Sequence, residues 1–164
     1  MNANPIHILL VEDNPDHIFL ARKAIHQEMG SRAHVSHVMT GEEAIDFLQR
    51  RGPHVASPRP DLILLDLQLP GRDGFWVVRT IKNDENLQSI PVVIFTSSDA
   101  DTDIQLGYQC GTNIYVCKPT GPDEFAARLR AIPAFWSRVA HLPPRPDRVA
   151  DQDPEPGEAG NGGA

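Results

Sequence analysis

The sequence predicts an α/β fold in which five βα units surround a parallel sheet. The first observation is that short apolar runs of strand length alternate along the chain with longer segments of helical periodicity. The second is that four of the apolar runs end in reactive polar groups. In chain order these are the acids Glu12 and Asp13, the acid Asp66, the hydroxyls of residues 96–98 and the amine of Lys118. Open α/β folds bind ligands at the carboxyl ends of their strands, so these groups are expected at the binding edge.

The predicted strands and helices follow one another in regular order. The strands are expected at residues 6–11, 34–38, 62–66, 92–96 and 114–117. The helices are expected at residues 15–29, 41–51, 75–83, 99–109 and from Asp123 onward. Asn14 before Pro15 is typical of a helix start, and Thr40 with Glu43 has the pattern of a capping box. Glycines stand where three helices should end: Gly30, Gly52 and Gly111.

Three of the helices carry further signals. The first has an apolar stripe at helical spacing, made of Ile18, Ala21, Ile25 and Met29. Asp73 followed by Gly74 is expected to form a turn and to cap the third helix. Pro133 interrupts the last helical segment, so a kink or two short helices are expected there.

Composition predicts one domain followed by a tail. The chain has 164 residues, of which 40% are hydrophobic, enough for a core without disulfides or metals. Residues 1–142 are expected to form the domain. Residues 143–164 are rich in proline, glycine and acids, which predicts disorder.

Composition also excludes several classes of protein. The two cysteines imply no disulfide framework and suit a reducing cytosol. No apolar run approaches the roughly 20 residues that cross a bilayer, and the amino terminus does not have the pattern of a signal peptide, so we expect a cytoplasmic protein. The formal net charge of -7 argues against direct nucleic-acid binding.

The strand ends supply what a phosphoryl acceptor needs. Asp66 ends the third apolar run and stands at the rim of the predicted sheet. Glu12 and Asp13 end the first run and offer oxygens suited to a hard divalent cation. Thr96 and Lys118 follow the fourth and fifth runs. A strand-end aspartate taken alone is more commonly a cap than a nucleophile. The combination with Asp13 and Lys118 favours the nucleophile.

In this order and at these positions, the residues resemble the receiver domain of response regulators in two-component signalling, over about residues 6–142. The resemblance implies a doubly wound, flavodoxin-like (βα)5 fold with a five-stranded parallel sheet. It implies that Asp66 is the phosphoacceptor. It also implies a Mg²⁺ site made by Asp13, Asp66 and the backbone carbonyl of Gln68, with Glu12 acting through water.

The same resemblance assigns the remaining roles. Lys118 would reach one phosphoryl oxygen and Thr96 would hydrogen-bond another. Thr96 and Tyr115 would form the switch. On phosphorylation the ring of Tyr115 would move inward, which would change the face made by the fourth helix, fifth strand and last helix. The peptide between Lys118 and Pro119 is expected to be cis.

A narrower resemblance concerns partners. The long loop at residues 51–60, the segment 118–122 and the pair Phe135 and Trp136 are similar to a subgroup of single-domain regulators that work with phytochrome-type histidine kinases. This implies a stand-alone regulator that catalyses only its own phosphorylation and dephosphorylation. We expect it to pass its signal to a protein partner, a phosphotransfer protein or a second copy, and we favour a homodimer through the fourth-helix to last-helix face.

Two other functions fit parts of the pattern. A phosphohydrolase with an aspartyl-phosphate intermediate usually has an acid two residues after the nucleophile, and Gln68 stands there instead. A receiver that only binds partners would not need to keep Asp13, Asp66 and Lys118 together. Seven histidines raise the possibility of a transition-metal site, but they show no paired ligand spacing with the cysteines.

Overall fold

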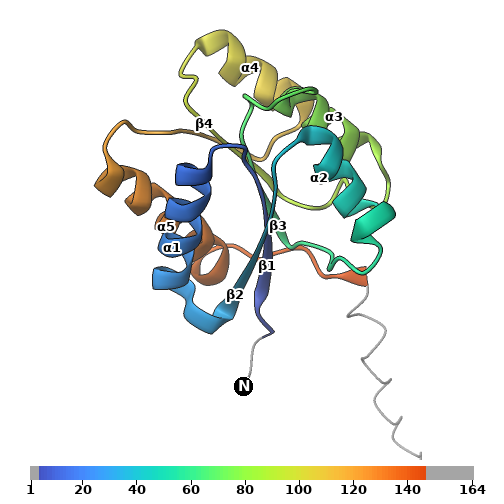
Figure 1. The fold of residues 1–164 in the computed structure, drawn as a ribbon, viewed down its shortest axis with the longest axis horizontal. Helices are drawn as coiled ribbons and strands as arrows, with labels where there is room; N and C mark the ends of the chain where they lie inside the picture. The colour runs from blue at the N-terminus through green and yellow to red at the C-terminus, as the bar shows by residue number, and fades with distance from the viewer. Residues whose placement is uncertain (1–3, 147–164) are drawn as a thin grey trace, which may run out of the picture.

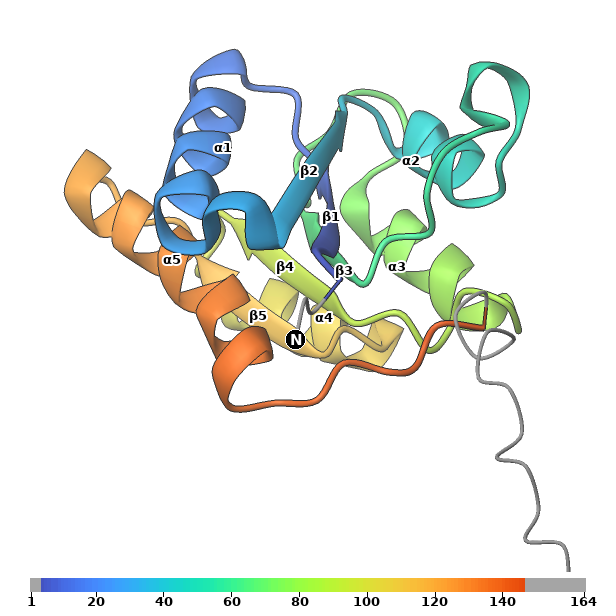
Figure 2. The ribbon, with the colours of Figure 1, turned by 90° about the horizontal axis from the view of Figure 1, so that it is seen from below.

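In the computed structural model, which describes residues 4–146, a five-stranded parallel sheet lies between two layers of helices (Figures 1 and 2). The strand order is β2-β1-β3-β4-β5. The strands are β1 (Ile6–Val11), β2 (Ala33–Val38), β3 (Leu62–Leu65), β4 (Val92–Thr96) and β5 (Ile114–Cys117). The helices are α1 (Pro15–Met29), α2 (Gly41–Leu48), α3 (Gly74–Asn83), α4 (Asp101–Cys110) and α5 (Pro122–Arg138). The predicted doubly wound, flavodoxin-like class is confirmed.

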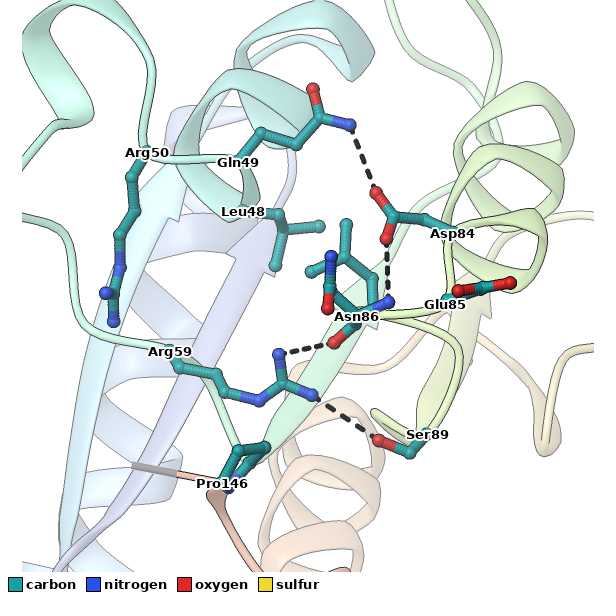
Figure 3. A pocket seen from close by; sticks show the side chains of 10 residues that line it. Leu48, Gln49, Arg50, Arg59, Asp84, Glu85, Asn86, Ser89 and Pro146 are labelled. Atoms are coloured by element: carbon teal, nitrogen blue, oxygen red, sulfur yellow. Dashed lines mark hydrogen bonds between the residues drawn. The ribbon is translucent and has the colours of Figure 1, made fainter. Parts of the chain in front are cut away.

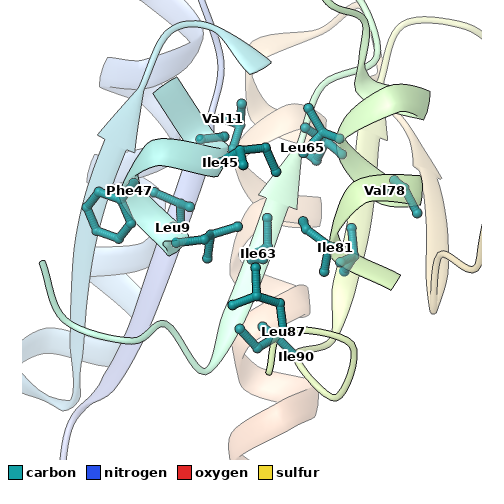
Figure 4. Packing of buried hydrophobic residues seen from close by; sticks show 14 of the residues in the cluster. Leu9, Val11, Ile45, Phe47, Ile63, Leu65, Val78, Ile81, Leu87 and Ile90 are labelled. Carbon is teal, nitrogen blue, oxygen red and sulfur yellow. The ribbon is translucent and has the colours of Figure 1, made fainter. Parts of the chain in front are cut away.

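Side chains of alternate strand residues enter two separate cores. Leu9 and Val11 of β1 pack with α2, α3 and their connections, as Figure 4 shows. Ile8 and Leu10 of the same strand pack on the other face, against α1 and α5. Strands covered by helices on both faces need apolar residues at every position. This explains why β3 is the continuous run Leu62–Leu65, with all four residues buried.

The predicted helix starts agree with the observed caps. The Asn14 side chain accepts hydrogen bonds from the backbone N–H groups of Asp16 and His17. Asp73 accepts a hydrogen bond of 2.9 Å from the backbone N–H of Trp76. Both caps lie at the carboxyl edge of the sheet. They therefore fix the first turns of α1 and α3 beside the strand ends that carry the polar residues.

Two helices differ most from prediction, while the ends of the third and fourth helices are displaced by one or two residues. The second was expected to reach residue 51 but ends at Leu48, because Arg50 takes a positive φ of 54° and the Arg51 N–H returns to the Asp46 carbonyl. The last helix was expected to kink or divide at Pro133, and the division is wrong: α5 continues through this residue. Leu129 and Pro133 are both buried, so packing against the sheet holds the helix together where proline removes one donor.

The segment after α5 makes a contact beyond the predicted boundary at residue 142. Residues 143–146 return beneath the amino ends of the strands, where buried Arg145 forms a two-point ion pair with buried Asp61. Beside them lies a cavity of about 550 Å³. Figure 3 shows its lining residues, among them Arg50, Arg59 and Pro146. The rest of the predicted tail lies outside the described residues. Within residues 4–146, no helix is long and apolar enough to span a membrane.

Candidate functional site

The carboxyl ends of the strands bring the predicted site residues together. Backbone hydrogen bonds continue the sheet one residue past the strands, from Glu12 N–H to Val38 O at 3.1 Å and from Asp66 N–H to Val11 O at 3.0 Å. The backbone N–H of Lys118 likewise donates to Thr96 O at 2.7 Å. The sheet itself therefore sets the positions from which these side chains extend.

Three carboxylates form an acidic cluster at this edge. Glu12, Asp13 and Asp66 each offer an oxygen, and these oxygens lie within 4.8 Å of one another. Glu12 and Asp66 are only 3% and 7% exposed. Burial raises the pKa of Glu12 above its usual value of 4.5, and the hydrogen bond and charge of Lys118 oppose that rise without cancelling it. The cluster thus concentrates negative charge where water screens it poorly.

Lys118 connects the acids to one another. Its Nζ lies 2.7 Å from Asp66 Oδ2 and 2.6 Å from Glu12 Oε2, and its side chain is 3% exposed. A third neighbour is His17 of α1, whose Nδ1 lies 3.0 Å from the same Nζ. One ammonium group is therefore enclosed by two carboxylates and an imidazole.

The carboxylate of Asp66 is held in one orientation. While Oδ2 accepts from Lys118, Oδ1 accepts a hydrogen bond of 3.1 Å from the backbone N–H of Gln68. Gly74 lets α3 begin directly against this residue, since a Cβ at position 74 would lie 2.6 Å from the Asp66 carbonyl oxygen. Glycine is needed there for close backbone approach.

A hydroxyl and an aromatic ring lie beside the site. Thr96 is fully buried at the end of β4, and its Oγ1 has no hydrogen-bond partner among residues 4–146. Tyr115 of β5 donates from its hydroxyl to the Ser98 carbonyl at 2.9 Å, which ties the ring to the loop after β4. Burial raises the pKa of this phenol above 10.0. The ring also packs closely over Gly107 of α4.

The structure brings together Glu12, Asp13, Asp66 and Lys118, as the strand pattern predicted. One expectation at this site is wrong. No peptide bond within residues 4–146 is cis, so the bond between Lys118 and Pro119 is trans. An X–Pro bond prefers trans by about 0.5–1 kcal/mol, and the ammonium reaches both acids with that isomer.

His17 is the site residue that the sequence did not reveal. Two features of the sequence could have indicated it: it follows Asp13 by four residues, and it falls in the first turn of a helix whose cap was predicted. Its contact with Lys118 depends on how α1 packs beside α5, which no local pattern encodes.

The acidic cluster has the chemistry of a divalent-cation site. Carboxylate oxygens are the ligands that hard divalent cations prefer, and three such groups converge here with oxygens close enough to share one ion. Among residues 4–146, no other group of three acids, histidines or cysteines comes as close together. Glu12, Asp13 and Asp66 are thus the candidate metal-binding residues.

Comparisons with known proteins agree with this geometry. A family model described as the response regulator receiver domain matches residues 8–130. Response regulator Rcp1 of Synechocystis sp. is 36% identical over 143 residues, covering 85% of this chain and 94% of Rcp1.

Two solved structures extend the comparison. The phosphorylated cyanobacterial phytochrome response regulator RcpA has a TM-score of 0.82 at 36% identity, covering 85% of this chain and 99% of that chain. The Mn²⁺-bound form of Rcp1 has a TM-score of 0.80 at 34% identity, covering 85% of this chain and 100% of that chain. By its sequence, its sheet and its strand-end residues, the chain belongs to the response regulator receiver family.

Proposed function

We propose that this chain is a stand-alone response regulator that accepts a phosphoryl group from a histidine kinase onto Asp66. The observation that carries the proposal is the Lys118 ammonium, 2.7 Å from Asp66 Oδ2 inside a cluster of three carboxylates. An ammonium in this position neutralises charge that phosphorylation would otherwise build up. Rcp1 is matched along 94% of its own length, which supports a regulator of one domain.

In the proposed transfer, a carboxylate oxygen of Asp66 attacks the phosphorus of a phosphohistidine. The new O–P bond forms as the P–N bond breaks, and the imidazole leaves with the electron pair and is protonated. The positive charge of the Lys118 ammonium attracts the phosphoryl oxygens as they arrive. The unpartnered hydroxyl of Thr96 supplies a hydrogen bond to a second phosphoryl oxygen.

We propose Mg²⁺ as the cofactor, held by Asp13 and Asp66 with the backbone carbonyl of Gln68, and by Glu12 through water. The ion would draw negative charge from the phosphoryl oxygens during transfer. The Mn²⁺-bound form of Rcp1 supports a divalent cation in a receiver similar to this one. The acidic cluster is the reason for proposing a cation, because three carboxylates and a phosphate need more positive charge than Lys118 alone provides.

The experiment that tests the acceptor is intact-mass measurement after incubation with acetyl phosphate and Mg²⁺. The native chain should gain one phosphate and Asp66→Asn should gain none. Labelling should stop at one phosphate per chain without turnover of a generic phosphate ester, since the chain modifies only itself. An unchanged gain in Asp66→Asn would assign the acceptor to another residue.

We further propose that Thr96 and Tyr115 carry the signal away from Asp66. A phosphoryl oxygen that attracts the Thr96 hydroxyl would shift the end of β4 and the loop that follows. Tyr115 is bonded to that loop through the Ser98 carbonyl and packs on α4 through Gly107. A displacement at Thr96 would therefore reach the face formed by α4, β5 and α5.

The proposed partner is a phytochrome-type histidine kinase. RcpA, with a TM-score of 0.82 to this chain, is a phytochrome response regulator. The test compares phosphotransfer from a purified phytochrome kinase with transfer from an unrelated histidine kinase at equal concentration. Transfer from the phytochrome kinase should be faster, and equal rates would contradict the pairing.

We also propose a homodimer through α4, β5 and α5. An apolar groove of about 200 Å³ lies between β5 and α5, lined by Ile114, Val116 and Trp136 among others. Phe135 beside it is 42% exposed, and Val139 is 72% exposed. Apolar area at an edge strand favours pairing with another chain. Sedimentation at tens of micromolar, with and without a phosphoryl mimic, should give a dimer, and a monomer under both conditions would contradict it.

A further inference from the structure

The ammonium group of Lys118 has all of its hydrogens assigned. A lysine ammonium carries three N–H donors and no acceptor. Three acceptors surround it, with Glu12 Oε2 at 2.6 Å, Asp66 Oδ2 at 2.7 Å and His17 Nδ1 at 3.0 Å. Because an ammonium can only donate, a hydrogen bond at 3.0 Å assigns the acceptor role to Nδ1 of His17 and places the ring hydrogen on Nε2.

The imidazole is itself held from two elements. His17 lies in the first turn of α1, where the Asn14 side chain caps its backbone N–H. Its ring contacts Phe125 at the start of α5, with centroids 5.0 Å apart. Phe125 is 4% exposed and packs edge-on against Phe95 of β4. The His17 side chain is 31% exposed, and its contact with buried Phe125 holds one side of the ring.

Building on the proposed function, we infer that His17 is a positioning residue for phosphoryl transfer, because it holds the Lys118 ammonium beside Asp66. Of the three acceptors, it is the only one that is not a carboxylate of the acidic cluster. The oxygens of Glu12 and Asp66 belong to the acidic cluster that a cation and an incoming phosphoryl group would use. His17 offers the ammonium an anchor that does not compete with either, so Lys118 keeps its place when the carboxylates are engaged elsewhere.

A matched pair of variants separates the hydrogen bond from the ring packing. Asparagine can present an acceptor near the position of Nδ1, whereas leucine keeps an apolar contact with Phe125 and offers no acceptor. With acetyl phosphate and saturating Mg²⁺, His17→Leu should be phosphorylated about two- to tenfold more slowly than the native chain, as expected for loss of one hydrogen bond. His17→Asn should stay within about twofold of the native rate. Equal losses in both variants, or a loss in neither, would overturn the assignment.

The effect must also pass through Lys118. In a Lys118→Met background, adding His17→Leu should cause no further slowing, because the ammonium that His17 holds is gone. If His17→Leu slows the reaction by the same factor with and without Lys118, the imidazole acts in some other way.

A measurement independent of phosphorylation distinguishes this inference from the proposed function. In a ¹⁵N NMR spectrum of the full chain, three acceptors should protect the Lys118 ammonium hydrogens from exchange in the native chain and in His17→Asn. The signal should be lost in His17→Leu. If Asp66 is never phosphorylated but this pattern holds, the proposed function fails and the anchor stands. A signal equally protected in His17→Leu would overturn the anchor whatever the phosphorylation result.

Discussion

Glu12 brings a charge to a position where water hardly reaches it, and the effect of that burial on stability has a definite sign. Burial raises the pKa of Glu12 in the folded chain above 4.5, so from that pH upward the folded state holds more protons than the unfolded state. The contribution of Glu12 to the free energy of unfolding should therefore fall as the pH rises through this window and then level off. Glu12→Gln does not titrate and should lack this slope.

The measurement is chemical denaturation of both chains in EDTA from about pH 4 to about pH 8, which spans the usual range of carboxyl titration and beyond. The stability of Glu12→Gln relative to the native chain should increase with pH. A native chain that gains stability relative to the variant over this range would mean that Lys118 outweighs burial at Glu12.

The hydroxyl of Thr96 lacks a hydrogen bond within the described part of the unphosphorylated fold and is expected to gain one from the phosphoryl group. Its hydroxyl is buried and has no hydrogen-bond partner within residues 4–146. Thr96→Val keeps the volume and removes the unpaired group, so it should raise the free energy of unfolding of the unphosphorylated chain by about 1 kcal/mol. Phosphorylation of Asp66 should become slower in the same variant. Urea denaturation and intact-mass kinetics measure the two effects, and a loss of stability would show that the hydroxyl is satisfied in solution.

At the scale of elements, α3 reaches Asp66 only because its first residue has no side chain. An alanine Cβ at position 74 would lie 2.6 Å from the Asp66 carbonyl oxygen and 2.7 Å from the Leu67 Cα, both of them backbone atoms. Gly74→Ala should therefore cost about 2 kcal/mol of stability and slow phosphorylation, because the start of α3 must move from the site. The start of α5 provides the control, since nothing lies within 4 Å of a Cβ at Gly121.

Gly121→Ala should leave the phosphorylation rate near the native value and lower the urea midpoint less than Gly74→Ala does, because alanine is a weaker N-cap than glycine but meets no neighbouring atom here. The two variants make the same chemical change at the start of a helix, where Gly74 is the first residue of α3 and Gly121 is the N-cap of α5. If they behave alike, the close approach at Gly74 is not what places α3 beside the acceptor.

For the whole molecule, the fold could be predicted from the sequence because strands and helices are indicated by local patterns of apolar residues. Short apolar runs such as Leu62–Leu65 are typical of strands covered on both faces, and the parallel arrangement of these strands brings Asp66 and Lys118 to one edge. Contacts between segments far apart in the sequence could not be predicted in this way. His17 and Lys118 are 101 residues apart, and Arg145 and Asp61 are 84 apart. Such pairs depend on how helices and strands pack against one another, and the periodicity of apolar residues does not specify that packing.

The ion pair between Arg145 and Asp61 makes the segment after α5 part of the fold. Both side chains are buried, at 8% and 6% exposure. Asp61 also accepts a hydrogen bond of 2.8 Å from the His7 backbone N–H, so the pair ties the end of the described chain to β1. Removing one member of a buried pair leaves the other charge without compensation and costs about 3 kcal/mol or more.

Two truncations and one pair of substitutions measure this connection. Compared with a chain that ends at residue 146, a chain that ends at residue 142 should have a free energy of unfolding lower by about 3 kcal/mol, and Arg145→Met should show a similar loss compared with the native chain. Adding Asp61→Asn to Arg145→Met should restore part of the loss, because the unpaired charge is then gone. If the two truncated chains unfold at the same urea concentration, residues 143–146 lie apart from the domain in solution, and its stable boundary is at Leu142.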